Sequence, residues 1–352
     1  MAYTTIDDPT AYFQTVLYTG NGQARALTFD GNSDLQPDWV WIKDRDNVRD
    51  HQLFDSVRGV GKILLSNSTA AEGDDNNRLS AFNSNGFSVG TNTTVNDNSQ
   101  KYVAWNWKAG TSFSNDASST SIGSIDSAGS VNTDAGFSIV SYTGTGSTGT
   151  VAHGLGVKPS FLIYKNRATT DSWNVQSDGL TSYDYYLRLN STGSQNNNID
   201  VGPTAPTSTV VTVGSHAQQN GDGNAMILYA FAEKQGYSKF GNYIGTAGNN
   251  GDAPFIYTGF KPAWFMVKNA GATSAWEIYD SKLLGYNDQN HQFRANANDA
   301  LSAVSDYVDF VSNGIKIRHN STGINEDGDN FIYMAFAENP FVTSTGVPTT
   351  AR

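Results

Sequence analysis

The sequence contains one motif three times, and this repetition constrains the fold more than any other feature. The motif is a proline, one spacer, four apolar or aromatic residues and a lysine, and it occurs at Pro37–Lys43, Pro159–Lys165 and Pro262–Lys268. A second motif, an alanine followed by an aromatic residue, begins 61, 65 and 67 residues after the lysines, at Ala104, Ala230 and Ala335. A period of roughly one hundred residues is too long for a solenoid repeat. The sequence therefore predicts three copies of one domain.

Each copy is predicted to consist of β-strands. Aromatic residues make up 12% of the chain and charged residues only 16%. Gly, Ser, Thr and Asn are abundant, which suits strands and turns better than long amphipathic helices. The first motif is apolar at consecutive positions, which is typical of a strand covered on both faces. A second strand should follow around the residue eight positions after each lysine, namely His51, Trp173 and Trp276. We predict an all-β chain of three tandem antiparallel sandwich or jelly-roll modules.

The copies set the predicted domain boundaries. The segment from 113 to 133 is rich in Ser, Gly and Asp, so we expect a linker or a surface excursion between copies 1 and 2. The N-terminal end is expected to be an arm that attaches to a partner and can be removed without loss of the fold. The C-terminal end is expected to be a tail that lies along a neighbour or is disordered. The predicted parts are an N-terminal arm (1–11), module 1 (12–112), a linker (113–133), module 2 (134–236), module 3 (237–341) and a C-terminal tail (342–352).

Charge and composition disfavour several classes of function. The net charge is −11, and phosphate contacts need clustered Lys and Arg, so we expect no nucleic-acid or anionic-lipid partner. The chain has no cysteine, which excludes disulfides and thiolate metal sites. It has no apolar stretch of the roughly 18 residues that span a membrane. Its first residues lack the basic start and apolar centre of a secretory signal. We therefore expect synthesis in a cytoplasm without export by the usual route.

Polar residues provide few candidates for catalysis or metal binding. His153 lies in a glycine-rich run without a nearby nucleophile or orienting acid, so we interpret it as a turn residue whose imidazole bonds to backbone. The five histidines are too scattered for a zinc site. Three acidic loops could either supply oxygen ligands to Ca²⁺ or form ordinary solvated turns. They are Glu72–Asn77, Asn220–Asn224 and Asn325–Asn330.

Matching acids in the copies raise the question of a glycosidase. Glu233 matches Glu338 and Asp55 matches Asp280, but in each case the remaining copy has no acid. A glycosidase needs two acids facing each other across one cleft, whereas acids at repeated positions are typical of turns and caps. We therefore predict no enzymatic activity and no catalytic residues, with a glycan depolymerase as the alternative.

A few aromatic residues outside the predicted core strands are candidates for contact with a glycan or a protein partner. Aromatic rings bury a large apolar area while Tyr and Trp keep a polar group for hydrogen bonding. Burial in the core or in an interface is the alternative for each of them. The candidates are Trp173, Tyr183, Tyr185, Tyr186 and Trp276.

Several runs resemble one group of marine bacteriophage virion proteins. They are Met1–Thr15, Leu17–Gly22, Asp34–Lys43, Asp55–Gly59, Ala135–Gly146 and His153–Pro159. Copy 3 departs from the pattern, since Gly259–Pro262 stands where the His-Gly-Leu-Gly run would be. The resemblance covers most of the chain and implies a tail-associated or other surface structural protein. It also implies concanavalin-like sandwich domains and no established catalytic residues.

The sequence thus predicts a non-enzymatic virion structural protein. The expected part is a tail fibre, tail appendage or receptor-binding component that contacts other virion proteins and a host-surface glycan. The alternative is a capsid decoration or cement protein that stabilises the head. Without disulfides, association would bury further apolar surface and make weak contacts multivalent. Because fibres are usually built from three chains, we expect a homotrimer.

Overall fold

Strands dominate the structure. The computed structural model describes residues 2–284, 287 and 289–349. Strands make up 43% of it and helices 6%. The all-β class predicted from composition is confirmed.

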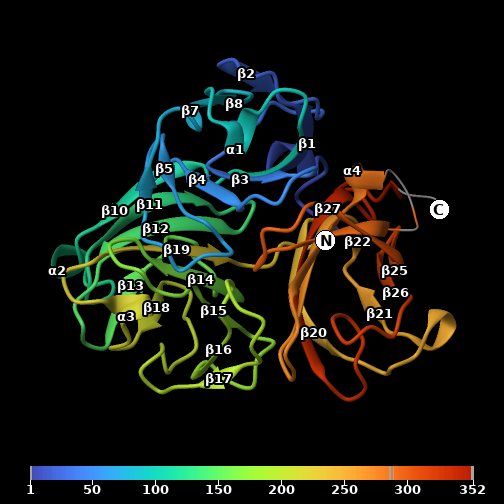
Figure 1. The fold of residues 1–352 in the computed structure, drawn as a ribbon. Helices are drawn as coiled ribbons and strands as arrows, with labels where there is room; N and C mark the ends of the chain where they lie inside the picture. Colours follow the sequence, from blue (N-terminus) through green and yellow to red (C-terminus); the bar gives the residue numbers. More distant parts are fainter. Residues whose placement is uncertain (1, 285–286, 288, 350–352) are drawn as a thin grey trace.

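One four-stranded antiparallel arrangement recurs in each third of the chain (Figure 1). In unit 1 the strand order is β1 (Phe13–Thr19), β9 (Lys101–Trp107), β3 (Trp39–Asp44) and β4 (Gln52–Asp55). In unit 2 it is β12 (Phe137–Thr143), β19 (Ala225–Phe231), β14 (Phe161–Asn166) and β15 (Asn174–Ser177). In unit 3 it is β20 (Ser238–Ile244), β27 (Asn330–Pro340), β22 (Phe260–Asn269) and β23 (Trp276–Asp280). The two motifs of the repeat therefore lie on neighbouring strands.

The lysines of the first motif occupy matching positions, as the repeat predicted. Their partners on the neighbouring strand are Val103, Ile227 and Ile332 for Lys43, Lys165 and Lys268. Each lysine is buried, and its ammonium group donates to the carbonyl of the next residue and to a carbonyl in the hairpin turn that follows. Burial lowers the pKa of each lysine to about 8. The motif lysine, present in all three copies, thus bonds an interior strand to the hairpin turn that follows it.

The remaining elements pack on the outer faces of these sheets or extend them. Unit 1 adds η1 (Pro9–Ala11), β2 (Arg25–Thr28), β5 (Lys62–Ile63), β6 (Gly73–Asp74), β7 (Leu79–Asn83), β8 (Gly86–Val89) and α1 (Thr93–Asn96). Unit 2 adds β10 (Thr111–Asn115), α2 (Ala117–Thr120), β11 (Ser127–Asn132), β13 (Gly149–Ala152), β16 (Tyr185–Tyr186), β17 (Asn196–Asn197), β18 (Val210–Val213) and α3 (Ala217–Asn220). Unit 3 adds η2 (Asn250–Asp252), β21 (Phe255–Tyr257), α4 (Ser281–Leu284), β24 (Gln289–Arg294), β25 (Ser302–Val311) and β26 (Gly314–Ile317).

The segment predicted as a linker, 113–133, forms sheet instead. Strands β10 and β11 pair with each other, and β11 pairs with β12, so they widen the sheet of unit 2. Several of their residues are exposed. A strand at the edge of a sheet with one open face needs few large apolar side chains, which is why its composition resembled that of a linker.

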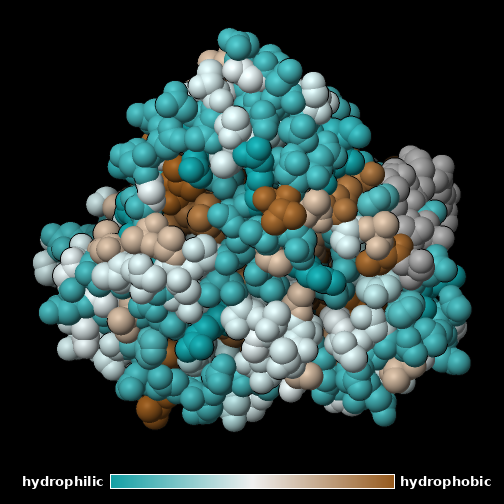
Figure 2. Space-filling model, viewed as in Figure 1, coloured by the Kyte–Doolittle hydropathy of each residue, from teal (hydrophilic) through white to brown (hydrophobic). Residues whose placement is uncertain are grey.

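All three units share one central core. Alternate residues of the interior strands point inward, and the residues between them point to a separate outer core within the same unit. On β3, for example, Trp39 and Trp41 join the central core, whereas Val40 and Ile42 join the outer core of unit 1. The apolar runs of the repeat are therefore covered on both faces, as predicted. The outside of the molecule is mostly hydrophilic, with small apolar patches where the three lobes meet (Figure 2).

Equivalent hydrogen bonds join neighbouring units. The first set consists of backbone bonds, each 2.9 Å from N to O, from Glu72 to Arg167, from Gln195 to Ala270 and from Leu301 to Arg45. These bonds join unit 1 to unit 2, unit 2 to unit 3 and unit 3 to unit 1. The three units therefore close into a ring.

The aromatic residue eight positions after each motif lysine makes the second set of bonds between units. Ring nitrogens of His51, Trp173 and Trp276 lie 3.1, 2.8 and 3.0 Å from the carbonyl oxygens of Arg294, Leu65 and Arg188. Trp41 Nε1 donates to His51 Nδ1 at 2.8 Å, so Nε2 is the nitrogen that carries a proton and donates to Arg294. Burial keeps the pKa of His51 well below its usual range, which preserves this neutral form. The repeated aromatic position is thus a contact between units.

The N-terminal arm is part of the fold, which corrects the expectation that it is dispensable. Thr4 and Ile6 are buried, and Thr4 Oγ1 donates to the Gln235 carbonyl of unit 2 at 2.7 Å. Asp7 accepts from the backbone of Ser344 in the C-terminal tail at 2.6 Å. Within the tail a bridge joins Val342 and Pro348. The arm was expected to attach to a partner, but these hydrogen bonds of its polar residues are made within the chain.

Deleting residues 1–11 should therefore destabilise the protein. Ile6 is only 3% exposed and belongs to the central core, and removal of one such side chain costs about 2–5 kcal/mol. We expect a lower denaturation midpoint in urea for the truncated chain than for the full chain. Unchanged stability would mean that the arm binds too weakly to contribute.

Candidate functional site

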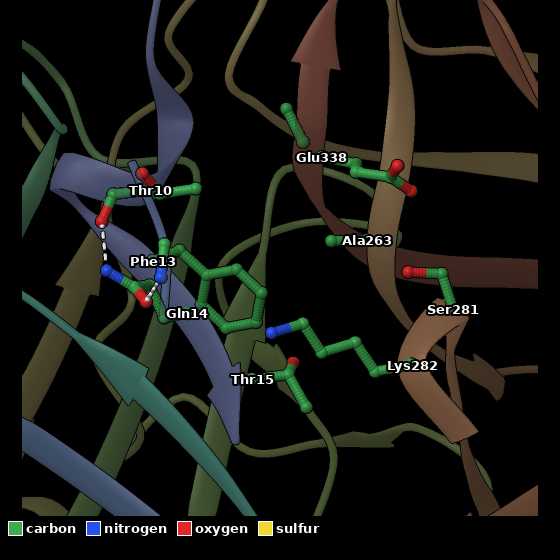
Figure 3. A pocket seen from close by; sticks show the side chains of 10 residues that line it. Thr10, Phe13, Gln14, Thr15, Ala263, Ser281, Lys282 and Glu338 are labelled. Atoms are coloured by element: carbon green, nitrogen blue, oxygen red, sulfur yellow. Dashed lines mark hydrogen bonds between the residues drawn. The ribbon is translucent and has the colours of Figure 1, made fainter. Parts of the chain in front are cut away.

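A cavity of about 380 Å³, the junction pocket, lies where units 1 and 3 meet. Its lining residues come from opposite ends of the chain (Figure 3). They are Thr10, Phe13, Gln14, Thr15, Gly31, Ala263, Ser281, Lys282, Ala337 and Glu338. Units 1 and 2, and units 2 and 3, follow one another along the chain, whereas units 3 and 1 meet with no chain connection between them. The pocket therefore marks the place where the ring closes without a chain connection.

The unit 1 wall of the pocket is held rigidly by one buried amide. Gln14 Nε2 donates to the Thr10 and Ser33 carbonyls at 2.8 and 2.9 Å, and Gln14 Oε1 accepts from the Gly31 amide at 3.0 Å. Both amide protons of Gln14 are thus used within the protein. The ring of Phe13 and the methyl groups of Ala263 and Ala337 supply the apolar part of the lining.

Asp280 lies behind this wall and links the two units. Thr15 Oγ1 and Trp105 Nε1, both from unit 1, donate to Asp280 Oδ2 at 2.6 and 2.9 Å. The backbone N–H of Lys282 donates to Asp280 Oδ1 at 2.8 Å, so Asp280 also caps the turn into α4. The carboxyl group is fully buried, and burial raises its pKa to about 6. Three donors from two units therefore hold one acid that protonates near neutrality.

The equivalent acid in unit 1 has a different environment. Asp55 forms a buried ion pair with Arg58 and accepts from the Tyr229 hydroxyl of unit 2 at 2.6 Å. Leu283 stands in unit 3 where unit 1 has Arg58. The Asp55 carboxyl also accepts from the backbone N–H of Arg58 at 2.8 Å. Both acids thus cap turns, as the sequence indicated, and both contact the neighbouring unit.

The raised pKa of Asp280 makes the junction sensitive to pH. Between about pH 4 and about pH 6 the folded chain holds a proton here that the unfolded chain has lost, so unfolding becomes easier as pH rises through this range. The effect of this group is on the order of 3 kcal/mol. Burial also raises the pKa of Glu277 and Asp38, which acts in the same direction.

In the wild type the free energy of unfolding should fall as the pH rises from about 4 to about 7, and Asp280→Asn should make this fall smaller. Urea titration at each pH measures it. The control is Asp30→Asn. Asp30 is exposed, and its bond to Lys282 lowers its pKa. An identical pH profile for wild type and Asp280→Asn would contradict the assignment.

The open side of the pocket carries weak charged contacts. Lys282 extends from α4 toward β1 (Figure 3) and its Nζ lies 2.9 Å from Asp30 Oδ1. The two side chains are 43% and 79% exposed, and exposed pairs of this kind contribute about 0–1 kcal/mol. Glu338 accepts from Lys261 Nζ at 2.9 Å. The pocket thus offers an apolar floor with an exposed ammonium at its rim, which suits binding more than proton transfer.

The structure places most of the predicted aromatic contacts inside the protein. Trp173 and Trp276 are buried in the central core and Tyr186 is also buried, so these three cannot stack on an external sugar. Tyr185 is half-buried against the same core. Tyr183 is also half-buried, and none of the five lines the junction pocket. For both tryptophans the alternative, burial in the core, therefore holds, and their ring N–H groups bond to carbonyls of the neighbouring unit.

Tyr183 belongs to a small polar cluster on unit 2. Its hydroxyl donates to Asp178 Oδ1 at 2.6 Å, and Lys158 Nζ lies 2.6 Å from the same oxygen. Lys158 also lies over the Tyr183 ring, 5.4 Å from its centre. The hydroxyl and ring are thus occupied by contacts within the unit.

The histidine and acidic-loop interpretations have different outcomes. His153 Nδ1 accepts from the Leu155 amide at 3.2 Å, Nε2 lies 3.3 Å from the Thr207 carbonyl, and Gly154 and Gly156 have positive φ. The predicted backbone-satisfied turn is confirmed. In the first acidic loop the Glu72 carboxylate pairs with Arg58 of its own unit and with Arg167 of unit 2. Among the described residues, no three His, Asp or Glu side chains gather closely enough to hold a metal ion.

The whole ring corresponds to one known sequence family. Residues 8–340 match the domain of unknown function DUF7483. The chain belongs to the DUF7483 family. The matched range includes all three units, so the ring and not the single unit corresponds to the family domain. No curated protein matches the sequence. Within the described part of this DUF7483 chain, no helix is long and apolar enough to cross a membrane.

Sequence reasoning missed the junction pocket of this DUF7483 chain. Thr15 and Asp280 are 265 residues apart and meet only because the ring closes. The one available signal was the match between Asp55 and Asp280, which pointed to a cap but not to the donors from the neighbouring unit.

Proposed function

We propose that the chain is a non-enzymatic structural protein of a bacteriophage virion, a tail fibre, tail appendage or receptor-binding component that contacts the host surface. The observation that carries the proposal is the closed ring of three equivalent units around one core. A single chain thereby forms a cysteine-free body with threefold pseudosymmetry, stabilised by burial and not by disulfides. Such a body suits a component that must keep its shape outside a cell. The sequence resemblance to virion proteins points in the same direction.

The units are best described as three β-sandwich modules of the concanavalin-like type. In each unit the outer face of the four-stranded sheet packs on its own apolar core, as expected of one half of a sandwich. The inner faces pack on each other across the ring. Triplication of one module accounts for the matching strand order and register.

The absence of enzymatic activity is part of the proposal. Glu233 and Glu338 each form an ion pair with a lysine, 2.8 and 2.9 Å long. All three donors around Asp280 come from the protein, which leaves its carboxyl group no access to a substrate. We therefore expect purified protein to leave host polysaccharide intact. Release of reducing ends, lost on changing one acid, would favour a depolymerase.

The proposal is tested by locating the chain in intact particles. Gold-labelled antibodies against the exposed region around Ile199 should mark the tail in electron micrographs. Label over the head would favour the alternative, a decoration protein. The virion assignment would be overturned if the particles bind no label and mass spectrometry finds no copy of the chain in them. A homotrimer and binding to other virion proteins remain predictions. The mass of the purified protein in solution tests the homotrimer.

A further inference from the structure

A second cavity of about 380 Å³ lies apart from the junction pocket, where the end of unit 2, the start of unit 3 and the N-terminal arm meet. It is called here the arm pocket. Its lining residues combine two tyrosines with a carboxylate, an ammonium group and an amide. They are Tyr3, Glu233, Gln235, Ser238, Lys239, Tyr257, Thr258 and Gly259.

Two tyrosines form its aromatic side. Tyr257 lies on β21, the outermost strand of its sheet, and is 55% exposed. The Tyr3 hydroxyl donates to the Gly259 carbonyl at 2.7 Å and lies 3.3 Å from the Tyr257 hydroxyl. A Cβ atom at Gly259 would come within 2.6 Å of the Tyr3 hydroxyl, and Gly259 has a positive φ. Glycine at this position therefore allows the arm to bring the second ring to the pocket.

The opposite side carries a balanced pair of charges. Glu233 Oε2 accepts from Lys239 Nζ at 2.8 Å, and Glu233 Oε1 accepts from the Phe240 amide at 3.1 Å. The side chains of Glu233 and Lys239 are 33% and 38% exposed, so both can reach a ligand as well as each other. Gln235 is exposed beside them, and its backbone is fixed by the bond from Thr4.

These groups fit a neutral sugar better than an ionic ligand. A pyranose ring has an apolar face that packs on an aromatic ring, and its neighbouring hydroxyls both donate and accept hydrogen bonds. The Glu233 carboxylate accepts, the Lys239 ammonium donates, and the Gln235 amide does both. Because Glu233 and Lys239 cancel in charge and the chain carries a net −11, the pocket has little attraction for an anionic ligand. A cavity of this volume lies within the range of small-ligand sites, roughly 300–1,000 Å³.

We propose that the arm pocket binds a neutral hexose unit of a surface polysaccharide, with the sugar face on Tyr257 and its hydroxyls on Glu233, Lys239 and Gln235. The inference rests on the proposed function, because contact with the host surface is what would give a sugar site its use. It also assigns the arm a part in binding as well as in stability, since Tyr3 completes the pocket.

The test uses the full chain and neutral hexasaccharides of glucose, galactose and mannose, with an alginate hexasaccharide as the acidic probe. Saturation-transfer NMR should detect at least one neutral probe and not the acidic one, and titration calorimetry should then measure its affinity. Tyr257→Ala and Glu233→Gln should each weaken binding by about tenfold or more. The matched control is Phe255→Ala, which removes another exposed ring from the same strand outside the pocket and should change affinity less than twofold.

Three outcomes would overturn the sugar site. These are no saturation transfer from any neutral probe, equal binding of the alginate probe, and unchanged affinity in Tyr257→Ala. Thermal melting of each variant separates lost binding from lost folding, because Tyr257 is mostly exposed and its truncation should not unfold the chain. Particle labelling is independent of these measurements. If the tail is labelled but no sugar binds, only the sugar site is contradicted. If a sugar binds but particles carry no label, only the virion assignment is contradicted.

Discussion

Replacing Trp276 by alanine should lower the free energy of unfolding by about 3–5 kcal/mol, as much as Trp264→Ala. Both side chains are 1% exposed and belong to the central core. The Trp264 ring packs against Trp105 and Trp107 of unit 1, whereas Trp276 Nε1 bonds to the Arg188 carbonyl of unit 2 at 3.0 Å. Each truncation would leave a large cavity at a boundary between two units.

Phenylalanine variants separate the two tryptophans. Trp264 Nε1 has no hydrogen-bond partner among the described residues, so Trp264→Phe removes no bond. Trp276→Phe removes the bond to the Arg188 carbonyl, which keeps the Ser191 amide as a donor, and should cost about 0.5–1.5 kcal/mol more. Chemical denaturation of the full chain measures all four variants, with Ile199→Ala as the control because Ile199 is 72% exposed. A loss at Trp276→Ala as small as that of the control would place its ring outside the core.

Unit 3 expressed alone, as residues 237–341, should fail to fold as a monomer. Its inward residues, among them Trp264, Met334 and Phe336, pack on side chains of the other two units. Separation would expose this whole face to water, and monomeric proteins rarely tolerate so large an apolar patch. Backbone hydrogen bonds that join unit 3 to its neighbours, such as those at Ala270 and Leu301, would be lost at the same time.

The full chain, by contrast, should unfold in one transition. Calorimetry should give a van't Hoff enthalpy equal to the calorimetric enthalpy for the full chain. The isolated unit should show poor chemical-shift dispersion or aggregation in NMR samples at the same concentration. A well-dispersed spectrum and a cooperative melt from residues 237–341 would mean that each unit folds independently, and that the shared core only adds to its stability.

Much of the strand structure could be predicted because its signal is local. The motif residues Trp39 to Lys43 are apolar at consecutive positions, and both faces of that strand are indeed buried. The similar spacing from Lys43, Lys165 and Lys268 to the later motif indicated one unit repeated three times, and the two motif strands do pair in every unit. The glycines after His153 likewise pointed to a turn, since positive φ is nearly a property of glycine.

Segments with polar or mixed composition were harder to predict. Residues 113–133 have too few apolar side chains to suggest strands, yet edge strands need few. The arm around Thr4 is polar, but its hydrogen bonds are made to residues more than 200 positions away. Such partners leave no trace in the local pattern.

The sequence by itself determined that the chain is all β, that it contains one motif three times, and that the motif strands are covered on both faces. Only the tertiary structure decided what covers them. An apolar run indicates burial, but it is the same whether the second face meets another sheet of its own unit or the sheets of two other units. Closure of the ring buried Trp173 and Trp276, turned the arm into part of the core, and brought Thr15 to Asp280. Each of these contacts joins distant parts of the chain, and therefore depends on how whole sheets pack and not on neighbouring residues.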